Sequence, residues 1–100
     1  MSRKLKFQTG IEIIDKKLYD YNTSCKIIDM LNDFVSKANI DMEKDNCDTR
    51  FDLNNYSFMF RGKIISKDDF LNKTVGNVFK NTNNSPIQVR ETKEVIGGKN

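Results

Sequence analysis

Tyr56-Ser-Phe-Met-Phe-Arg-Gly-Lys-Ile-Ile65 has the pattern of a β-hairpin, with an aromatic strand, a turn that contains a glycine, and a short aliphatic strand. Glycine suits the reversal because it adopts positive φ without steric cost. Side chains alternate between the two faces of a strand, so Phe58 and Phe60 are predicted to point into a core and Met59 to point outward. The hairpin therefore predicts a sheet with one buried face.

A helix is predicted on the N-terminal side of this hairpin. Its apolar side chains recur every three or four positions, as one face of an amphipathic helix requires: Ile27, Ile28, Leu31, Phe34, Val35 and Ala38. Asn22-Thr23-Ser24 offers side chains that could cap the first turn. The helix is expected to lie with its apolar face on the sheet and its polar face in water.

Residues 39–55 separate the helix from the hairpin, and they predict a long surface loop because they hold few large apolar groups. The loop is rich in carboxylates: Asp41, Glu43, Asp45, Asp48 and Asp52. These residues lack the central glycine and the terminal glutamate of an EF-hand calcium loop. No metal site is therefore expected here.

The N-terminal segment from Lys4 to Ile13 predicts a strand, because its apolar residues fall on one side when side chains alternate. A second strand is predicted at Leu18 to Tyr21. The turn between the two strands can fall at Thr9-Gly10 or at residues 15–17, since both positions have suitable residues. The register of this first hairpin stays open.

The chain after the central hairpin predicts three further segments. Residues 66–71 suggest a capped helical turn, and residues 74–79 a loop that places Val75 or Val78, together with Phe79, in the core. Residues 81–84 predict a polar loop, and residues 86–92 a final alternating strand. Proline is tolerated at the first position of such a strand.

This order of strands around one helix is typical of the α+β class. The chain has 100 residues, 37% of them hydrophobic, which suits one domain. We expect a domain over residues 1–92 and a flexible tail over residues 93–100. Its core should pack residues of the helix against three residues of the sheet, Phe7, Phe58 and Val89.

Composition excludes several classes of protein. Seventeen basic and 14 acidic residues give a net charge of +3, which is too balanced to favour a nucleic-acid partner. No apolar run could span a bilayer and no secretory signal is present, so a soluble cytoplasmic or nuclear protein is expected. The chain has no histidine, so neither Cys25 nor Cys47 has a catalytic partner. We expect no enzyme activity, no catalytic residue, no cofactor and no metal site.

Phe60-Arg-Gly-Lys-Ile-Ile65 resembles the corresponding hairpin of the ubiquitin family, and the similarity extends from about Lys4 to Gly98. The resemblance implies a β-grasp fold, in which a mixed sheet of four to five strands packs on one main helix. Gly97-Gly98 stands where mature modifiers end, and residues 74–79 look like a segment of the ubiquitin-fold modifiers. The loop at residues 39–55 is longer than that of ubiquitin, so the chain is not ubiquitin itself.

The resemblance implies a modifier that is made as a precursor. A processing protease would remove Lys99-Asn100, and activating and conjugating enzymes would then join the Gly98 carboxylate to target proteins. Glycines allow the close backbone approach that the activating enzyme needs. Glu94 stands where ubiquitin carries an arginine read by its activating enzyme and is more like SUMO, so a different activating enzyme is expected.

The resemblance also indicates a partner surface. Met59 stands where ubiquitin has the centre of its recognition patch, and Lys63 where ubiquitin has a lysine used in chains. An extended peptide could also add to the strand at residues 18–21, in a SUMO-like groove beside the helix, with lysines 16, 17, 26 and 37 attracting acidic flanks. Two alternatives stay open: a non-conjugated module that binds protein or RNA, and a sulfur carrier. In each case we expect a monomer.

Overall fold

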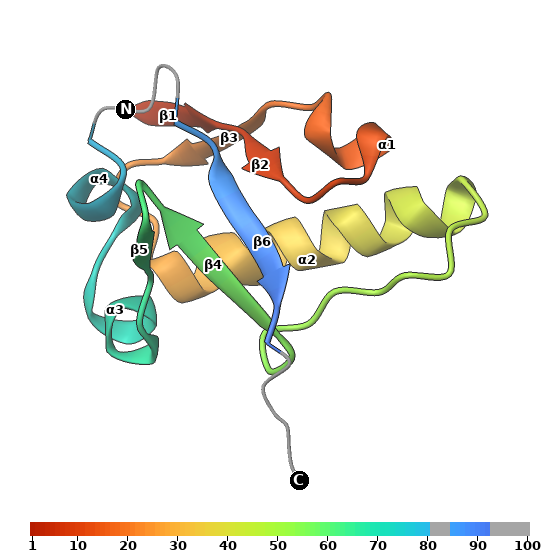
Figure 1. Cartoon of the computed structure of the whole chain (residues 1–100). Coiled ribbons are helices and arrows are strands. Elements are labelled where there is room, and N and C mark those ends of the chain that lie inside the picture. The colour runs from red at the N-terminus through yellow and green to blue at the C-terminus, as the bar shows by residue number, and fades with distance from the viewer. Residues whose placement is uncertain (81–84, 93–100) are drawn as a thin grey trace, which may run out of the picture.

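The structure is a computed structural model that describes residues 1–80 and 85–92, and these residues alternate strands with one long and three short helices (Figure 1). The elements follow in the order β1 (Ser2–Leu5), β2 (Phe7–Gln8), α1 (Glu12–Asp15), β3 (Tyr19–Asn22), α2 (Ile27–Lys44), β4 (Tyr56–Phe60), β5 (Lys63–Ile64), α3 (Lys67–Asn72), α4 (Val75–Val78) and β6 (Ile87–Glu91). The predicted α+β class is confirmed.

A mixed four-stranded sheet in the order β2-β6-β4-β5 forms one layer of the fold, and β1 and β3 form a separate antiparallel pair. β2 and β6 run parallel, whereas β4 runs antiparallel to both of its neighbours. Only Lys6 separates β1 from β2, so one N-terminal segment contributes to both sheets. The expected mixed sheet is confirmed, but its N-terminal segment is divided.

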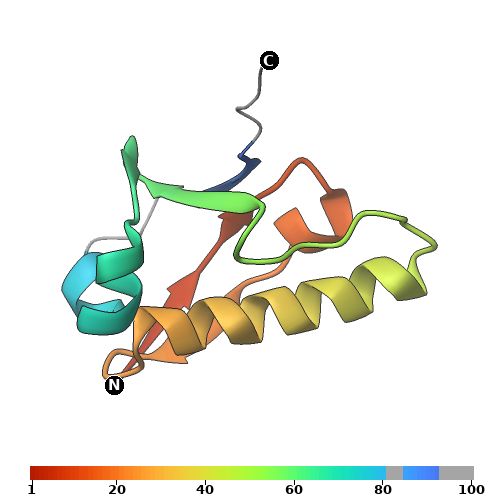
Figure 2. The same cartoon turned by 90° about the horizontal axis from the view of Figure 1, so that it is seen from below.

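α2 packs on one face of the sheet, so sheet and helix form two layers (Figure 2). Phe34 of α2 lies at the centre of the core and stacks on Phe7 of β2 with ring centroids 3.7 Å apart. Its ring also makes edge contacts with Tyr19 and Phe58. Burying each such side chain contributes about 1.5–3 kcal/mol. Of the helix residues predicted to face the sheet, Ile28 and Val35 are half-buried rather than buried.

The prediction of one strand from Lys4 to Ile13 is wrong beyond Gln8. Gly10 has φ of +88°, and the short helix α1 follows it. The Asp15 carboxylate accepts hydrogen bonds from the backbone N–H groups of Thr9 (2.8 Å) and Gly10 (2.9 Å). These bonds satisfy the backbone groups that a continuing strand would have paired, so the chain turns and α1 occupies the connection.

α2 differs from the prediction at both ends. It begins at Ile27, and its N-cap residue Lys26 makes no side-chain cap, so the expected caps of Asn22-Thr23-Ser24 are wrong. Residues 39–44, predicted as loop, belong to the helix because Ala38 and Met42 bury the same face four residues apart. The remaining loop, residues 45–55, runs back beside α2 (Figure 2).

The predicted hairpin is confirmed, with Arg61 at φ +54° and Gly62 at φ +80° in its turn. The capped turn after it is also confirmed, as α3 with Ser66 as N-cap. Residues 74–78, predicted as loop, instead contain the short helix α4, which buries Val75, while Val78 stays half-buried and Phe79 is buried. The final strand is confirmed at Ile87–Glu91, and the loop predicted at residues 81–84 lies outside the described residues.

Candidate functional site

The predicted conjugation residues Gly97 and Gly98, together with Glu94, lie outside the described residues. The described chain ends one residue after β6, the strand that lies between β2 and β4. The parts of the predicted site that can be placed are therefore Met59 and Lys63.

Met59 is half-buried in β4, on the face opposite to the buried Phe58 and Phe60, as predicted. The register sets it opposite Ile64 of β5 and Gln88 of β6, and residues opposite one another share a face of the sheet. Ile64 is 64% exposed, so Met59 has one large apolar neighbour on this face. Arg90 lies opposite Ser57, two rows along the sheet and on the same face as Met59.

Lys63 is exposed at the start of β5, where it pairs with Phe60 rather than with Met59. The two residues predicted as one partner surface therefore stand in adjacent rows of the sheet, whose side chains point to opposite faces. Lys63 instead lines a second surface, described below.

A groove of about 350 Å³ lies between β3 and α2, at the place suggested for an added peptide strand. We name it the β3–α2 groove. It is lined by residues 17–20 and by Lys37, Ile40 and Asp41. Leu18 and Ile40 are 63% and 50% exposed, so it contains apolar surface. Among the described strands, β3 pairs with β1 alone, which leaves its other edge without a strand partner.

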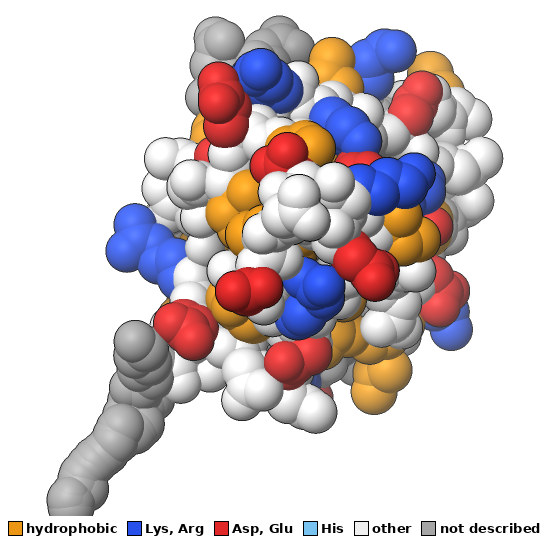
Figure 3. Space-filling model, turned by 90° about the vertical axis from the view of Figure 1, so that its right-hand side faces the viewer, with side chains coloured by type: hydrophobic (Ala, Val, Ile, Leu, Met, Phe, Trp, Pro, Cys, Tyr) orange, Lys and Arg blue, Asp and Glu red, His pale blue; other side chains and the backbone are white. Residues whose placement is uncertain are grey.

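Most lysines near this groove are engaged in ion pairs. Lys17 pairs with Asp41 across the groove, Lys37 pairs with Asp33 at 2.9 Å, and Lys16 pairs with Glu12. The lining residues comprise two lysines and two aspartates, so they carry no net charge. The expectation that these lysines attract acidic flanks stays a prediction, although Lys16, Lys17 and Lys37 are already engaged in ion pairs within the fold. The face on the right-hand side of Figure 1 shows the same interleaving of acidic and basic side chains (Figure 3).

Tyr21 and Asp33 join β3 to α2 beside the groove. The Tyr21 hydroxyl donates a 2.8 Å hydrogen bond to Asp33. Burial first, and then this bond to a carboxylate, raise the pKa of Tyr21. Burial opposes ionisation of Asp33, but the hydrogen bonds from Lys37 and Tyr21 prevail and lower the pKa of this carboxyl. The charged carboxylate therefore stabilises the packing of β3 on α2.

A larger groove, of about 440 Å³, lies between β5, α3 and α4. We name it the β5–α4 groove. Its polar lining residues are Arg61, Lys63, Asp69, Lys73, Asn77 and Lys80, and its apolar lining residues are Phe60, Ile64, Ile65 and Val78. These residues come from the hairpin, from α3 and from α4, which lie side by side at one end of the sheet (Figure 1).

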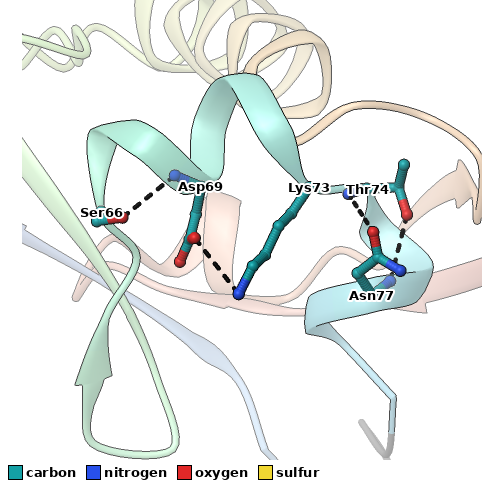
Figure 4. A network of polar contacts seen from close by, with 5 residues as sticks. All are labelled: Ser66, Asp69, Lys73, Thr74 and Asn77. Carbon is teal, nitrogen blue, oxygen red and sulfur yellow. Dashed lines mark hydrogen bonds and ion pairs between the residues drawn. The ribbon is translucent and has the colours of Figure 1, made fainter.

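Two side-chain caps fix the helices that wall the β5–α4 groove (Figure 4). The Ser66 hydroxyl accepts a hydrogen bond from the Asp69 N–H, and Thr74 and Asn77 form a reciprocal capping box. Asp69 and Lys73 form an ion pair one turn apart on α3, at 3.4 Å. Such caps satisfy N–H groups that the first turn of a helix leaves without partners, so each contributes about 1 kcal/mol.

The sequence pattern missed Ile64, Lys73 and Lys80 as surface residues of interest. Ile64 follows Lys63 in a two-residue strand, where no period can be measured. Lys73 and Lys80 flank α4, which was predicted as a loop, so nothing indicated that they approach the hairpin. The Ser66 and Thr74 hydroxyls, each three residues before a polar side chain, have the spacing of helix N-caps. This spacing was the sequence feature that could have indicated the two short helices beside the groove.

Burial raises the pKa of the half-buried Cys25 thiol, which disfavours the reactive thiolate. Within residues 1–80 and 85–92, no three histidine, cysteine or carboxylate side chains gather closely enough to hold a metal ion. In the same ranges, none of the helices combines the length and apolar composition that a bilayer crossing requires.

No protein-family model, no curated protein and no solved structure matches this chain.

Proposed function

We propose that this chain is a ubiquitin-like modifier with a β-grasp domain, and that it is conjugated to target proteins through Gly98 after removal of Lys99-Asn100. One observation carries the proposal: the parallel pairing of β2 with β6 inside a sheet that packs on α2. In a β-grasp, the first and last strands pair in this way and each is flanked by a hairpin. The order β2-β6-β4-β5, with β1 directly before β2 in the chain and paired with β3, fits that arrangement.

The position of the diglycine supports the same proposal. Gly97-Gly98 follows β6 after only a few residues, so the last strand leads directly into the proposed tail. An activating enzyme and a conjugating enzyme must bring the Gly98 carboxylate close to a thiol, and glycines leave room for that approach. Glu94 in this tail carries a negative charge, so the activating enzyme must offer a site that accepts one.

The proposal places the protein in the cytoplasm or the nucleus, as a monomer when it is not conjugated. Cys25 and Cys47 are both free thiols, which suits a reducing compartment. Met59 and Lys63 are proposed to contact partners separately, because the register places them on different faces of the sheet. Met59 with Ile64 offers an apolar contact, and methionine adapts well to varied partners.

The test is a conjugation assay with purified protein that ends at Gly98, incubated with ATP and a lysate from the source cells. We expect adducts of higher mass that vanish when Gly98 is changed to alanine or when ATP is omitted. The full chain to Asn100 should form adducts only after the lysate has removed its last two residues. Circular dichroism shows whether all three proteins are folded. Folded protein ending at Gly98 that forms no adduct would refute conjugation.

The β3–α2 groove favours a second candidate function, a ubiquitin-like module that binds proteins without being conjugated. The open edge of β3 can pair with an extended peptide, while Leu18 and Ile40 contact its apolar side chains. The net charge of zero in this groove favours an uncharged peptide over an acidic one. Ile40→Asp should abolish such binding without unfolding the domain, since Ile40 is exposed.

The intact mass of protein from its native cells separates these functions. A chain that ends at Gly98 supports the modifier, and a chain that ends at Asn100 supports the binding module. A sulfur carrier, the remaining alternative, would also end at Gly98, but with the mass increase of a sulfur in place of one carboxylate oxygen.

A further inference from the structure

We propose that the β5–α4 groove binds an acidic peptide segment of a partner protein, with carboxylates held by its lysines and an aliphatic side chain on Ile64 and Val78. Among the described residues that line it, this surface lacks Met59 but shares Lys63 and Ile64 with the partner contacts proposed above, and it does not depend on conjugation through Gly98.

The first support is the sign of the charge. Among the described residues, four cationic side chains and one anionic side chain line this groove, which gives it a net charge of +3. The whole chain has a net charge of +3, so the remaining residues together carry none. The β3–α2 groove, with two lysines and two aspartates, is neutral by the same count. A negatively charged ligand is therefore attracted to the β5–α4 groove rather than to the β3–α2 groove.

The second support is that two of these cations have no acidic partner in the part of the chain that the structure describes. Lys73 pairs with Asp69, and Arg61 lies over the Phe60 ring and donates to the Ser85 hydroxyl at 3.4 Å. No ion pair within the described residues involves Lys63 or Lys80. Both are exposed residues that line the groove, Lys63 from the hairpin and Lys80 from the segment just after α4.

The third support is the apolar surface between the cations. Ile64, which is 64% exposed, and the half-buried Val78 both line the groove. Solvated lysines alone would bind any anion weakly, but burial of an aliphatic side chain on Ile64 adds affinity in proportion to the apolar area removed from water. Charged rims around an apolar centre are the usual arrangement of a protein interface.

The same surface disfavours other ligands. The groove is only partly enclosed and only partly apolar, whereas small-molecule sites enclose most of the ligand. Single-stranded nucleic acid is bound by exposed aromatic side chains on which bases stack. Among the described residues, the exposed large hydrophobic side chains are all aliphatic or methionine. A peptide uses the carboxylate and aliphatic contacts that this groove offers.

The groove is held in shape before a ligand arrives. Ser66 caps α3, Thr74 and Asn77 cap α4, and the Asp69–Lys73 ion pair holds the lysine along the wall (Figure 4). A rigid wall reduces the entropy lost on binding, so a short peptide is sufficient as a ligand.

The test uses the full chain and a fluorescein-labelled peptide that has two leucines flanked on each side by three glutamates. A matched peptide has glutamines in place of the glutamates. We expect the acidic peptide alone to raise the anisotropy, and we expect its binding to weaken as salt is added. NMR titration of the ¹⁵N-labelled chain should shift amides of residues 61–65 and 69–80 most strongly.

Variants then identify the contacts. The double variant Lys63→Glu with Lys80→Glu should weaken binding of the acidic peptide at least about tenfold, since it reverses two charges at the rim. Lys44→Glu is the matched control, because this lysine lies at the far end of α2 and should leave binding unchanged (Figure 1). Ile64→Gln removes the apolar contact while retaining the charges. Introduced into the wild-type chain or into the Lys44→Glu variant, it should weaken binding of the acidic peptide to the same extent.

Several results would overturn the proposal. They are an absence of binding by the folded full chain, equal binding of the glutamine peptide, amide shifts centred on the β3–α2 groove, or equal losses in the rim variant and in Lys44→Glu. Tighter binding of a single-stranded oligonucleotide than of the peptide would assign the groove to nucleic acid instead. Thermal melts show that each variant is folded. Conjugation through Gly98 is measured separately, so failure of one proposal leaves the other intact.

Discussion

Tyr19 and Tyr21 are alternate residues of β3, and replacing each by phenylalanine should change stability in opposite directions. The Tyr21 hydroxyl donates a hydrogen bond of 2.8 Å to Asp33, whose carboxylate also pairs with Lys37. The Tyr19 hydroxyl is buried, and within the described residues no group accepts or donates a hydrogen bond to it. Tyr21→Phe therefore removes a hydrogen bond, whereas Tyr19→Phe removes a buried hydroxyl that makes no hydrogen bond within the described residues.

The magnitude follows from the surroundings of each hydroxyl. A hydrogen bond to a charged group contributes about 1.5–3 kcal/mol, but the Asp33 side chain is 43% exposed and can recover a bond to water. We therefore expect Tyr21→Phe to cost about 1 kcal/mol, which lowers Tm by roughly 4–8 °C in a domain of this size. Tyr19→Phe removes the cost of an unpaired buried hydroxyl, so it should stabilise the domain by up to about 1 kcal/mol.

Urea unfolding followed by circular dichroism, together with thermal melts at pH 7, measures both variants. The double variant Tyr21→Phe with Asp33→Asn tests whether the bond is the cause, because its loss should be smaller than the sum of the single losses. A Tyr21→Phe protein as stable as the wild type, or a Tyr19→Phe protein as destabilised as Tyr21→Phe, would refute the assignment of these two hydroxyls.

The same variants should differ in alkaline solution. Burial raises the pKa of Tyr19 to about 12 from its ordinary 10.0, and burial together with the bond to Asp33 raises the pKa of Tyr21. Both phenols favour the protonated form in the folded state. Their contribution is therefore fully present below pH 10, the unfolded value, and is lost as the pH rises towards the folded pKa values. Each phenylalanine variant should show a shallower loss of stability between pH 9 and pH 11 than the wild type, and identical slopes would contradict this.

Two further substitutions test the loop and α4. The Asn39 side chain makes hydrogen bonds of 3.0 and 2.8 Å to the backbone of Phe51, so Asn39→Ala should lower the free energy of unfolding by about 2 kcal/mol and speed proteolysis within residues 45–55. The control Asn32→Ala, at an exposed position of α2, should do neither. Equal digestion of the two variants would refute the role of Asn39. A Cβ at Gly76 would lie 3.0 Å from both the Cβ and the carbonyl oxygen of Thr23. Gly76→Ala should therefore lower the free energy of unfolding by about 1–3 kcal/mol. A Tm at or above that of the wild type would contradict this close approach.

The sequence predicts the fold best where periodicity is long. α2 repeats its apolar residues over several turns, and the central hairpin combines alternating aromatic residues with Gly62. The strand predicted across Ile11 and Ile13 failed because alternation over a few residues cannot be distinguished from one turn of helix. Asp15, whose carboxylate caps Thr9 and Gly10, ended the strand, and this bond depends on a side chain five or six residues away.

The candidate surfaces were less predictable, because they depend on register and on neighbours distant in sequence. Met59 was correctly placed on the outer face of the sheet, but its neighbour Ile64 follows from the pairing of β4 with β5. The β5–α4 groove joins Lys63 to Lys80, which only the folding of α3 and α4 brings together. The β3–α2 groove lies where the open strand edge suggested, yet ion pairs within the fold had already engaged most of its lysines.

The place of β6 between β2 and β4 has a consequence for how the protein forms in the cell. β2 pairs with β6 through Phe7 and Ile87, at opposite ends of the described chain. Because β6 comes after every other described strand, β2 and β4 have no neighbour on their shared side until the ribosome has released residues 87–91. Closing such a distant pair is slow, and a stalled or shortened nascent chain would expose two unpaired strand edges to quality control.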